Sequence, residues 1–140
     1  MSSMDKCRPI EQVRQRKRNG GKWCAPDKRL AIMLRDGCQC VYCGATVEDG
    51  ASLTLDHIIP WILYGSNEPD NLVCACLSCN SRRQDNNIET FLFDCGYTDE
   101  YVSRVLVHIR QTTQKDIAMC RQIAKELLQN RSITAFTGKR

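Results

Sequence analysis

Two short segments, Cys40-Val41-Tyr42-Cys43 and Cys76-Leu77-Ser78-Cys79, each place two cysteines three positions apart. A turn of this kind directs both thiols at one point, and four thiolates bind one Zn²⁺ ion tetrahedrally. The sequence therefore predicts a structural zinc site made by Cys40, Cys43, Cys76 and Cys79. Four thiolates leave no open position on the ion, so we expect it to stabilise the fold and to take no part in catalysis.

Other cysteines leave alternatives open. Cys38 and Cys74 lie close enough in the chain to replace one of the four ligands. An iron–sulfur cluster is another use of four thiolates, although nothing else in the sequence indicates electron transfer. Four scattered cysteines are expected to be free thiols that pack as small apolar residues: Cys7, Cys24, Cys95 and Cys120.

The length of 140 residues corresponds to one modest domain. Because the segment around the cysteines is short and polar, it needs a metal or disulfides for stability. No run of about 18 apolar residues is present, and the N-terminal segment lacks the apolar stretch of a secretory signal. We therefore expect a cytoplasmic protein without a membrane span, in which paired cysteines bind metal.

The net charge of +4 is unevenly distributed along the chain. Residues 1–24 hold seven basic and two acidic residues, whereas the remainder is nearly neutral. This distribution favours a polyanion as partner, and a disordered solubilising leader is the alternative interpretation. We expect residues 1–27 to form a basic arm with four candidate nucleic-acid contacts: Arg14, Arg16, Lys17 and Arg18.

Between the cysteine pairs, the pattern predicts the order strand, loop, strand, helix. Residues 51–59 and 71–74 are typical of two short antiparallel strands, and residues 77–85 of a helix that begins at the second cysteine pair. A further helix is predicted over 28–36, with Asp27 as its N-cap. These elements form a compact ββα unit enclosed by the zinc site.

The C-terminal part has the spacing of amphipathic helices. Residues 98–111 place apolar side chains at helical intervals, and Thr113 to Asp116 resembles a capping box before another helix. We predict an α+β fold, a small zinc-stabilised ββα-metal core (28–92) with flanking and C-terminal α-helices (93–140). The helices of this extension are expected to pack on the core or to form a dimer interface.

Four polar residues carry a family resemblance. The run Leu55-Asp56-His57-Ile58-Ile59-Pro60, followed by Asn71 and then by Asn80 directly after the last cysteine, resembles the HNH endonuclease family in its zinc-containing form. The match covers roughly residues 28–92. It implies a ββα-metal fold and divalent-metal-dependent cleavage of nucleic-acid phosphodiesters, and stand-alone members commonly occur in phages or mobile elements.

The resemblance also implies roles for the catalytic residues. His57 is the general base, Asp56 a ligand of the catalytic metal, and Asn71 supports the histidine loop. Asn80 takes the final ligand position, where many members have histidine. The oxygen ligands of Asp56 and Asn80 suit Mg²⁺ or Mn²⁺, and a histidine with a pKa near 6.5 is an effective base at neutral pH. Since neighbours on a strand point to opposite sides, a bend or bulge is expected at His57.

Arg82 and Arg83 follow on the same predicted helix, and one of them is expected to contact a phosphate. The sequence thus predicts a Mg²⁺- or Mn²⁺-dependent endonuclease, monomeric or homodimeric, with double-stranded DNA as the expected partner and RNA left open. The alternative is a non-catalytic zinc-dependent module that binds nucleic acid or protein. The second histidine, His108, is expected to be structural.

Overall fold

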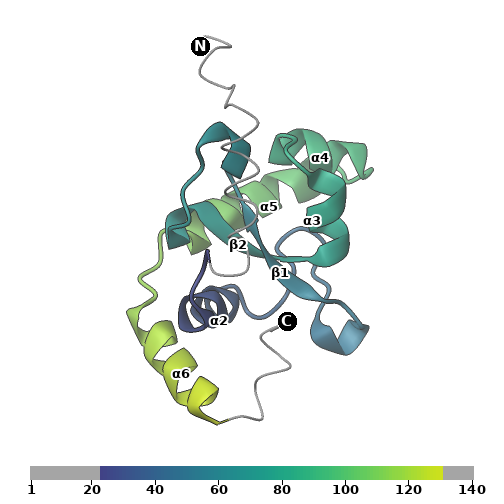
Figure 1. The fold of residues 1–140 in the computed structure, drawn as a ribbon. Helices are drawn as coiled ribbons and strands as arrows, with labels where there is room; N and C mark the ends of the chain where they lie inside the picture. Colours follow the sequence, from purple (N-terminus) through teal and green to yellow (C-terminus); the bar gives the residue numbers. More distant parts are fainter. Residues whose placement is uncertain (1–22, 131–140) are drawn as a thin grey trace.

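A two-stranded antiparallel sheet lies at the centre of the computed structural model, which describes residues 23–130 (Figure 1). Strand β1 (Leu53–His57) pairs with β2 (Leu72–Cys76), and helix α3 (Leu77–Arg83) follows β2 without a break. The predicted α+β class and the order strand, loop, strand, helix are confirmed. Four further helices surround this unit: α2 (Pro26–Arg35), α4 (Ile88–Asp94), α5 (Asp99–Thr112) and α6 (Ala118–Gln129).

The hairpin positions both the cysteines and the polar residues. Leu53 pairs with Cys76 and His57 with Leu72, and the register between them is continuous. Every residue of β2 is buried, as expected of a strand covered on both faces. Cys76 ends the strand and caps α3, because its Sγ accepts a hydrogen bond from the Cys79 amide (3.4 Å). The second cysteine pair is therefore fixed by a strand end and a helix start together.

Two predicted helix caps are wrong. Helix α2 has Ala25 as N-cap and Pro26 in its first turn, a favoured place for proline, so Asp27 already lies inside the helix. The carboxylate of Asp27 instead accepts a hydrogen bond from Arg121 Nε of α6 (2.7 Å). Thr113 does not start a capping box, because it closes α5 and its hydroxyl donates to the Ile109 carbonyl.

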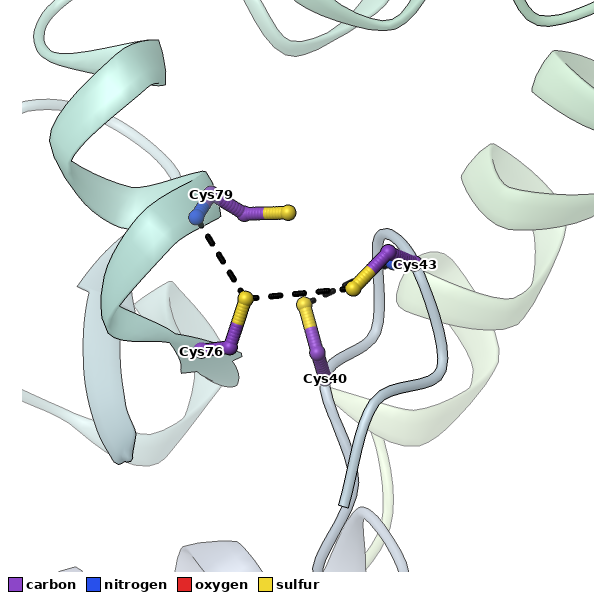
Figure 2. Close-up of side chains that lie close together, drawn as sticks. All are labelled: Cys40, Cys43, Cys76 and Cys79. Carbon is purple, nitrogen blue, oxygen red and sulfur yellow. Dashed lines mark hydrogen bonds between the residues drawn. The ribbon is translucent and has the colours of Figure 1, made fainter. Parts of the chain in front are cut away.

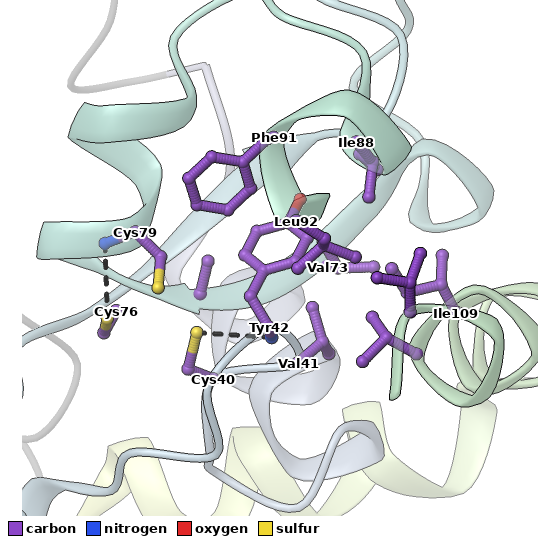
Figure 3. Close-up of a cluster of buried hydrophobic side chains, with 13 residues drawn as sticks. Cys40, Val41, Tyr42, Val73, Cys76, Cys79, Ile88, Phe91, Leu92 and Ile109 are labelled. Carbon is purple, nitrogen blue, oxygen red and sulfur yellow. Dashed lines mark hydrogen bonds between the residues drawn. The ribbon is translucent and has the colours of Figure 1, made fainter. Parts of the chain in front are cut away.

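Hydrophobic clusters lie on both faces of the hairpin. One contains Cys40, Cys76 and Cys79, together with Tyr42 of the loop before β1 and side chains from β2, α4 and α5 such as Val73 and Ile109 (Figure 3). The other joins α2 to the opposite face of the strands through Ile32, Leu55 and others. Helix α5 thus contributes to the same core as the ββα unit, although it belongs to the segment predicted as an extension.

A buried carboxylate connects three elements. Asp36, at the end of α2, accepts hydrogen bonds from the Arg35 guanidinium (2.8 Å), the Cys74 amide of β2 (2.8 Å) and the Thr112 hydroxyl of α5 (2.8 Å). Its charge is compensated within the interior, as a buried carboxylate requires. Helix α6 lies beside α2, on the side away from α3 and α4 (Figure 1). Among the helices of residues 23–130, none has the length and apolar character needed to cross a membrane.

Candidate active site and zinc centre

Four cysteine sulfurs meet at one end of the hairpin. Figure 2 shows Cys40 and Cys43 on the loop before β1 and Cys76 and Cys79 at the start of α3, with their sulfurs directed toward one another. All four Sγ atoms lie within 4.8 Å of each other, and those of Cys43 and Cys76 are 3.8 Å apart. A tetrahedron with Zn–S bonds of about 2.3 Å has sulfur–sulfur edges of about 3.8 Å. The cluster therefore has the composition and spacing of a site that can hold a zinc ion.

Backbone amides stabilise negative charge on two of these sulfurs. The amides of Tyr42 and Cys43 donate to Cys40 Sγ (3.4 and 3.5 Å), and the Cys79 amide donates to Cys76 Sγ. Burial nevertheless raises the pKa of Cys40 to about 11. Burial also opposes ionisation of Cys76. The hydrogen bonds that Cys76 Sγ accepts outweigh this effect of burial, so the pKa of the Cys76 thiol is lowered. A cation is needed to keep all four groups as thiolates at neutral pH.

The other cysteines near the pairs lie elsewhere. Cys74 is fully buried in the cluster between α2 and the hairpin, and Cys38 packs against that same cluster. Among the described residues, the group able to hold a metal contains the four paired cysteines and neither of these two. Arg82 borders the group, because its guanidinium donates to Cys79 Sγ (3.6 Å) and Cys95 Sγ (3.8 Å).

A second site lies at the other end of α3. A cavity of about 390 Å³ is lined by Asp56, His57 and Asn80, the three residues singled out for catalysis that the structure brings together. The hairpin supplies the first two and α3 supplies the third. The remaining lining residues are Pro60, Trp61, Gln84 and Asp85.

Asp56 is held at a fixed orientation by two donors. It is 5% exposed, and its Oδ2 accepts hydrogen bonds from the Tyr42 hydroxyl (2.6 Å) and from Arg83 Nη1 (2.8 Å). Burial and the neighbouring carboxylate raise the pKa of Tyr42 well above its usual value, so its phenol keeps the proton that it donates. Within residues 23–130, Oδ1 of Asp56 has no hydrogen-bond partner and is left for a ligand.

Asn80 is oriented in a similar way. Its Nδ2 donates to Thr54 Oγ1 (2.9 Å) and to the Leu55 carbonyl (3.1 Å), both on β1. Because the amide group is planar, these two hydrogen bonds of Nδ2 direct Oδ1 away from β1. In the described part of the chain, Oδ1 has no hydrogen-bond partner. One carboxylate oxygen and one amide oxygen on a single cavity are the ligand types that a hard divalent cation prefers.

His57 is the last residue of β1. Its ring centroid lies 5.0 Å from that of Trp23 and 5.7 Å from that of Trp61, and its Nε2 lies 2.8 Å from Asn67 Oδ1. The paired residues of β1 and β2 contain no bulge, but the chain bends at Ile58 and Ile59, directly after the strand ends at His57, which lines the same cavity as Asp56. Trp23 lies in the segment that the sequence assigned to a basic arm.

Asn71 does not line this cavity but holds the chain next to it. Its Oδ1 accepts from the Ile59 amide (2.8 Å), and its Nδ2 donates to the carbonyls of Ile59 (3.1 Å) and Ser66 (2.9 Å). Gly65 allows this close approach, because a Cβ there would lie 1.7 Å from the Ile59 carbonyl oxygen. The asparagine thus connects the loop after the histidine to the start of β2.

Arg83 lies in the interior of the protein. It is 1% exposed, and its guanidinium donates to Asp56 as well as to three backbone carbonyls, those of His57, Ile58 and Asn86. Of the two arginines of which one is expected to contact a phosphate, Arg83 is therefore the one already engaged within the protein. The four basic residues proposed as contacts in the N-terminal arm lie outside the described residues: Arg14, Arg16, Lys17 and Arg18.

Several supporting residues were missed from the sequence. Thr54 orients Asn80 and Tyr42 orients Asp56, while Asn67 and Trp23 contact His57. Of these residues, only Thr54 could have been found from the sequence. It precedes Asp56 by two positions on a predicted strand, so the two side chains point to the same face of the strand. The others act across distances in the chain that no local pattern reports.

The comparisons with known proteins agree with this geometry. Residues 38–86 match the family model described as HNH endonuclease, so this segment is an HNH endonuclease domain. Among curated relatives, the CRISPR-associated endonuclease Cas9 of Actinomyces naeslundii is 30% identical over 105 residues, which is 71% of this chain and 9% of that protein. Cas9 of Corynebacterium diphtheriae is 42% identical over 56 residues, which is 39% of this chain and 5% of that protein.

The chain spans less than a tenth of the length of these two relatives. Among solved structures, the crystal structure of the Type II-C Cas9 enzyme from Actinomyces naeslundii aligns with a TM-score of 0.46 and 21% identity. That alignment covers 80% of this chain and 14% of the other.

Proposed function

We propose that this chain is a divalent-metal-dependent endonuclease that hydrolyses phosphodiester bonds in DNA, with His57 as general base. The observation that carries the proposal is the cavity where Asp56, His57 and Asn80 converge. A carboxylate, an imidazole and an amide are the groups that metal-assisted attack of water on a phosphodiester needs.

Each residue has a distinct task in this proposal. Asp56 and Asn80 would hold Mg²⁺ or Mn²⁺ through Oδ1 of each side chain. When bound, such an ion neutralises the charge that builds on the phosphate and the leaving oxygen. His57 accepts the proton of the attacking water. Tyr42 and Arg83 occupy Oδ2 of Asp56, so the carboxylate keeps one orientation throughout.

The substrate we propose is double-stranded DNA. The arm residues Arg14, Arg16, Lys17 and Arg18 would add affinity that does not depend on sequence and falls steeply with salt. Arg82 lies exposed on α3 and remains a proposed contact, whereas the buried guanidinium of Arg83 is committed to Asp56 and to backbone carbonyls. The proposed organisation is an arm (1–27), a nuclease core (28–92) and a helical segment (93–140) that shares its hydrophobic core.

The test is cleavage of supercoiled plasmid by the zinc-loaded protein with and without Mg²⁺ or Mn²⁺. The variant His57→Ala should lose at least about a hundredfold in rate, the usual contribution of a general base. His108→Ala is the matched control, because His108 lies exposed on α5 outside the cavity, and it should cut like the wild type. Binding without cutting under either metal would favour the non-catalytic zinc module instead.

A further inference from the structure

The imidazole of His57 has one hydrogen-bond partner whose chemistry fixes the position of its proton. Nε2 lies 2.8 Å from Oδ1 of Asn67, the carbonyl oxygen of a side-chain amide. A carbonyl oxygen only accepts hydrogen bonds, so a hydrogen bond at this contact places the hydrogen on Nε2. A neutral imidazole has a single N–H, and its lone pair therefore resides on Nδ1.

Asn67 is itself held next to the histidine. The Gly65 amide donates to the Pro60 carbonyl (3.0 Å), the Glu68 amide donates to Ser66 Oγ (3.3 Å), and Asn71 binds the Ser66 carbonyl. Asn67 thus lies in a loop that is tied on both sides to the segment directly after His57. These hydrogen bonds hold Asn67 beside the histidine.

The two tryptophans restrict the ring but do not choose between its nitrogens. Trp23 and Trp61 contact the imidazole through their ring systems, at 5.0 and 5.7 Å between centroids. Ring contacts of this kind limit tilting of the imidazole. They are nearly the same when the imidazole ring is flipped by 180° about its Cβ–Cγ bond. A hydrogen bond to one nitrogen distinguishes the two states.

We infer that Asn67 is a positioning residue that holds His57 in the Nε2–H tautomer and makes Nδ1 the proton-accepting nitrogen. The part of this inference that concerns proton acceptance rests on the proposed function, in which His57 is the base. The part that concerns the tautomer does not, because it depends on the contact alone.

The first experiment measures the tautomer directly, by ¹⁵N NMR of the imidazole nitrogens in the full-length, zinc-loaded protein above the titration of histidine. The chain has two histidines, so exposed His108 serves as an internal reference. His57 should show a protonated Nε2 and a bare Nδ1. Asn67→Ala should give a mixture of tautomers, whereas Asn67→Asp, which keeps an oxygen acceptor, should retain the Nε2–H form.

Glu68→Ala is the matched control in the same loop, because its exposed side chain makes a 3.7 Å ion pair with Lys28 and does not contact His57. It should leave the tautomer unchanged. A protonated Nδ1 in the wild type, or an unaltered tautomer in Asn67→Ala, would overturn the inference.

The second experiment measures plasmid cleavage by the same variants. Asn67→Ala should lower kcat about tenfold to a hundredfold, as removal of an orienting partner does at other histidine sites, with plasmid affinity unchanged. Asn67→Asp should restore much of the rate and move the acidic limb of the pH profile to higher pH, because its carboxylate favours imidazolium. The other acidic groups on the cavity, Asp56 and Asp85, are the same in every variant.

The two experiments separate the two claims. A wild type that shows the Nε2–H tautomer but cuts no DNA would overturn the proposed function and leave the tautomer assignment standing. A wild type that cuts DNA, with full activity retained in Asn67→Ala, would overturn the positioning role of Asn67 and leave the nuclease standing.

Discussion

At the scale of single residues, the candidate site depends on side chains that fix other side chains. Asp56, Asn80 and His57 each contact a supporting polar group, and each of those groups comes from another part of the chain. The residues proposed to carry the chemistry were chosen from their types and spacing, and the structure brings three of them to one cavity. Their supports were not, because a hydrogen bond between distant residues leaves no periodic signal.

Loss of the Arg83 side chain should destabilise the fold strongly. Arg83→Ala leaves Asp56 with a buried charge and three carbonyls without their donor, and such broken pairs cost about 3–5 kcal/mol. Urea unfolding of the zinc-loaded protein measures the effect. Arg82→Ala, one position earlier on the same helix and exposed, should have a much smaller effect, and equal losses would contradict the role given to Arg83.

Relief of backbone strain at Gln84 should stabilise the protein. Gln84 has φ 52° and ψ −124°, a conformation that residues with a side chain rarely adopt, and it lines the candidate active site. Gln84→Gly should raise the free energy of unfolding by about 1 kcal/mol, net of the greater chain entropy of glycine. Gln84→Ala retains the Cβ and should show no such gain in the same urea titration.

At the scale of elements, the hairpin and the start of α3 could be predicted because their signals are local. Alternating apolar residues and two cysteine pairs defined them without knowledge of the rest of the fold. The predicted caps at Asp27 and Thr113 failed for the converse reason. Asp27 is engaged by Arg121 of α6, and Thr113 by the last turn of α5.

Zinc should be required for this unit to fold. Cys43→Ser removes one of four ligands and should abolish stoichiometric zinc and cooperative unfolding, because metal binding supplies much of the folding free energy at such sites. Metal analysis and thermal unfolding measure both properties. Cys120→Ala, on α6 and outside the cluster, should keep one zinc per chain. A Cys43→Ser protein that stays folded without metal would contradict the prediction.

At the scale of the whole molecule, the C-terminal helices belong to the same packed body as the hairpin. Helix α5 supplies Val102, Val105 and Ile109 to the cluster around the cysteines, and α6 packs on α2. An amphipathic pattern indicates that one face of a helix is buried. It does not indicate which element or molecule covers that face. The sequence therefore predicted packing of these faces on each other or on the core, with a dimer interface as the alternative.

The contact between α2 and α6 should weaken in acid. The hydrogen bond from Arg121 lowers the pKa of Asp27, so the pair is fully stabilising above the unfolded pKa of about 3.9 and is lost as pH falls through the lower folded value. Because Arg121 is 43% exposed, the contribution should stay below about 1 kcal/mol. Asp27→Asn should therefore reduce stability at pH 7 and make no difference near pH 2, as measured by urea unfolding at both pH values.

The direct succession of Cys79 and Asn80 has a consequence for control of the proposed catalytic site. The sulfur cluster and the proposed catalytic cavity share one turn of α3, so a disturbance of the second cysteine pair displaces the amide oxygen that would hold the catalytic cation. A chelator or an oxidant of thiols could then silence cleavage without ever entering the cavity. Metal supply and redox state would then act on the proposed nuclease activity through the first turn of α3.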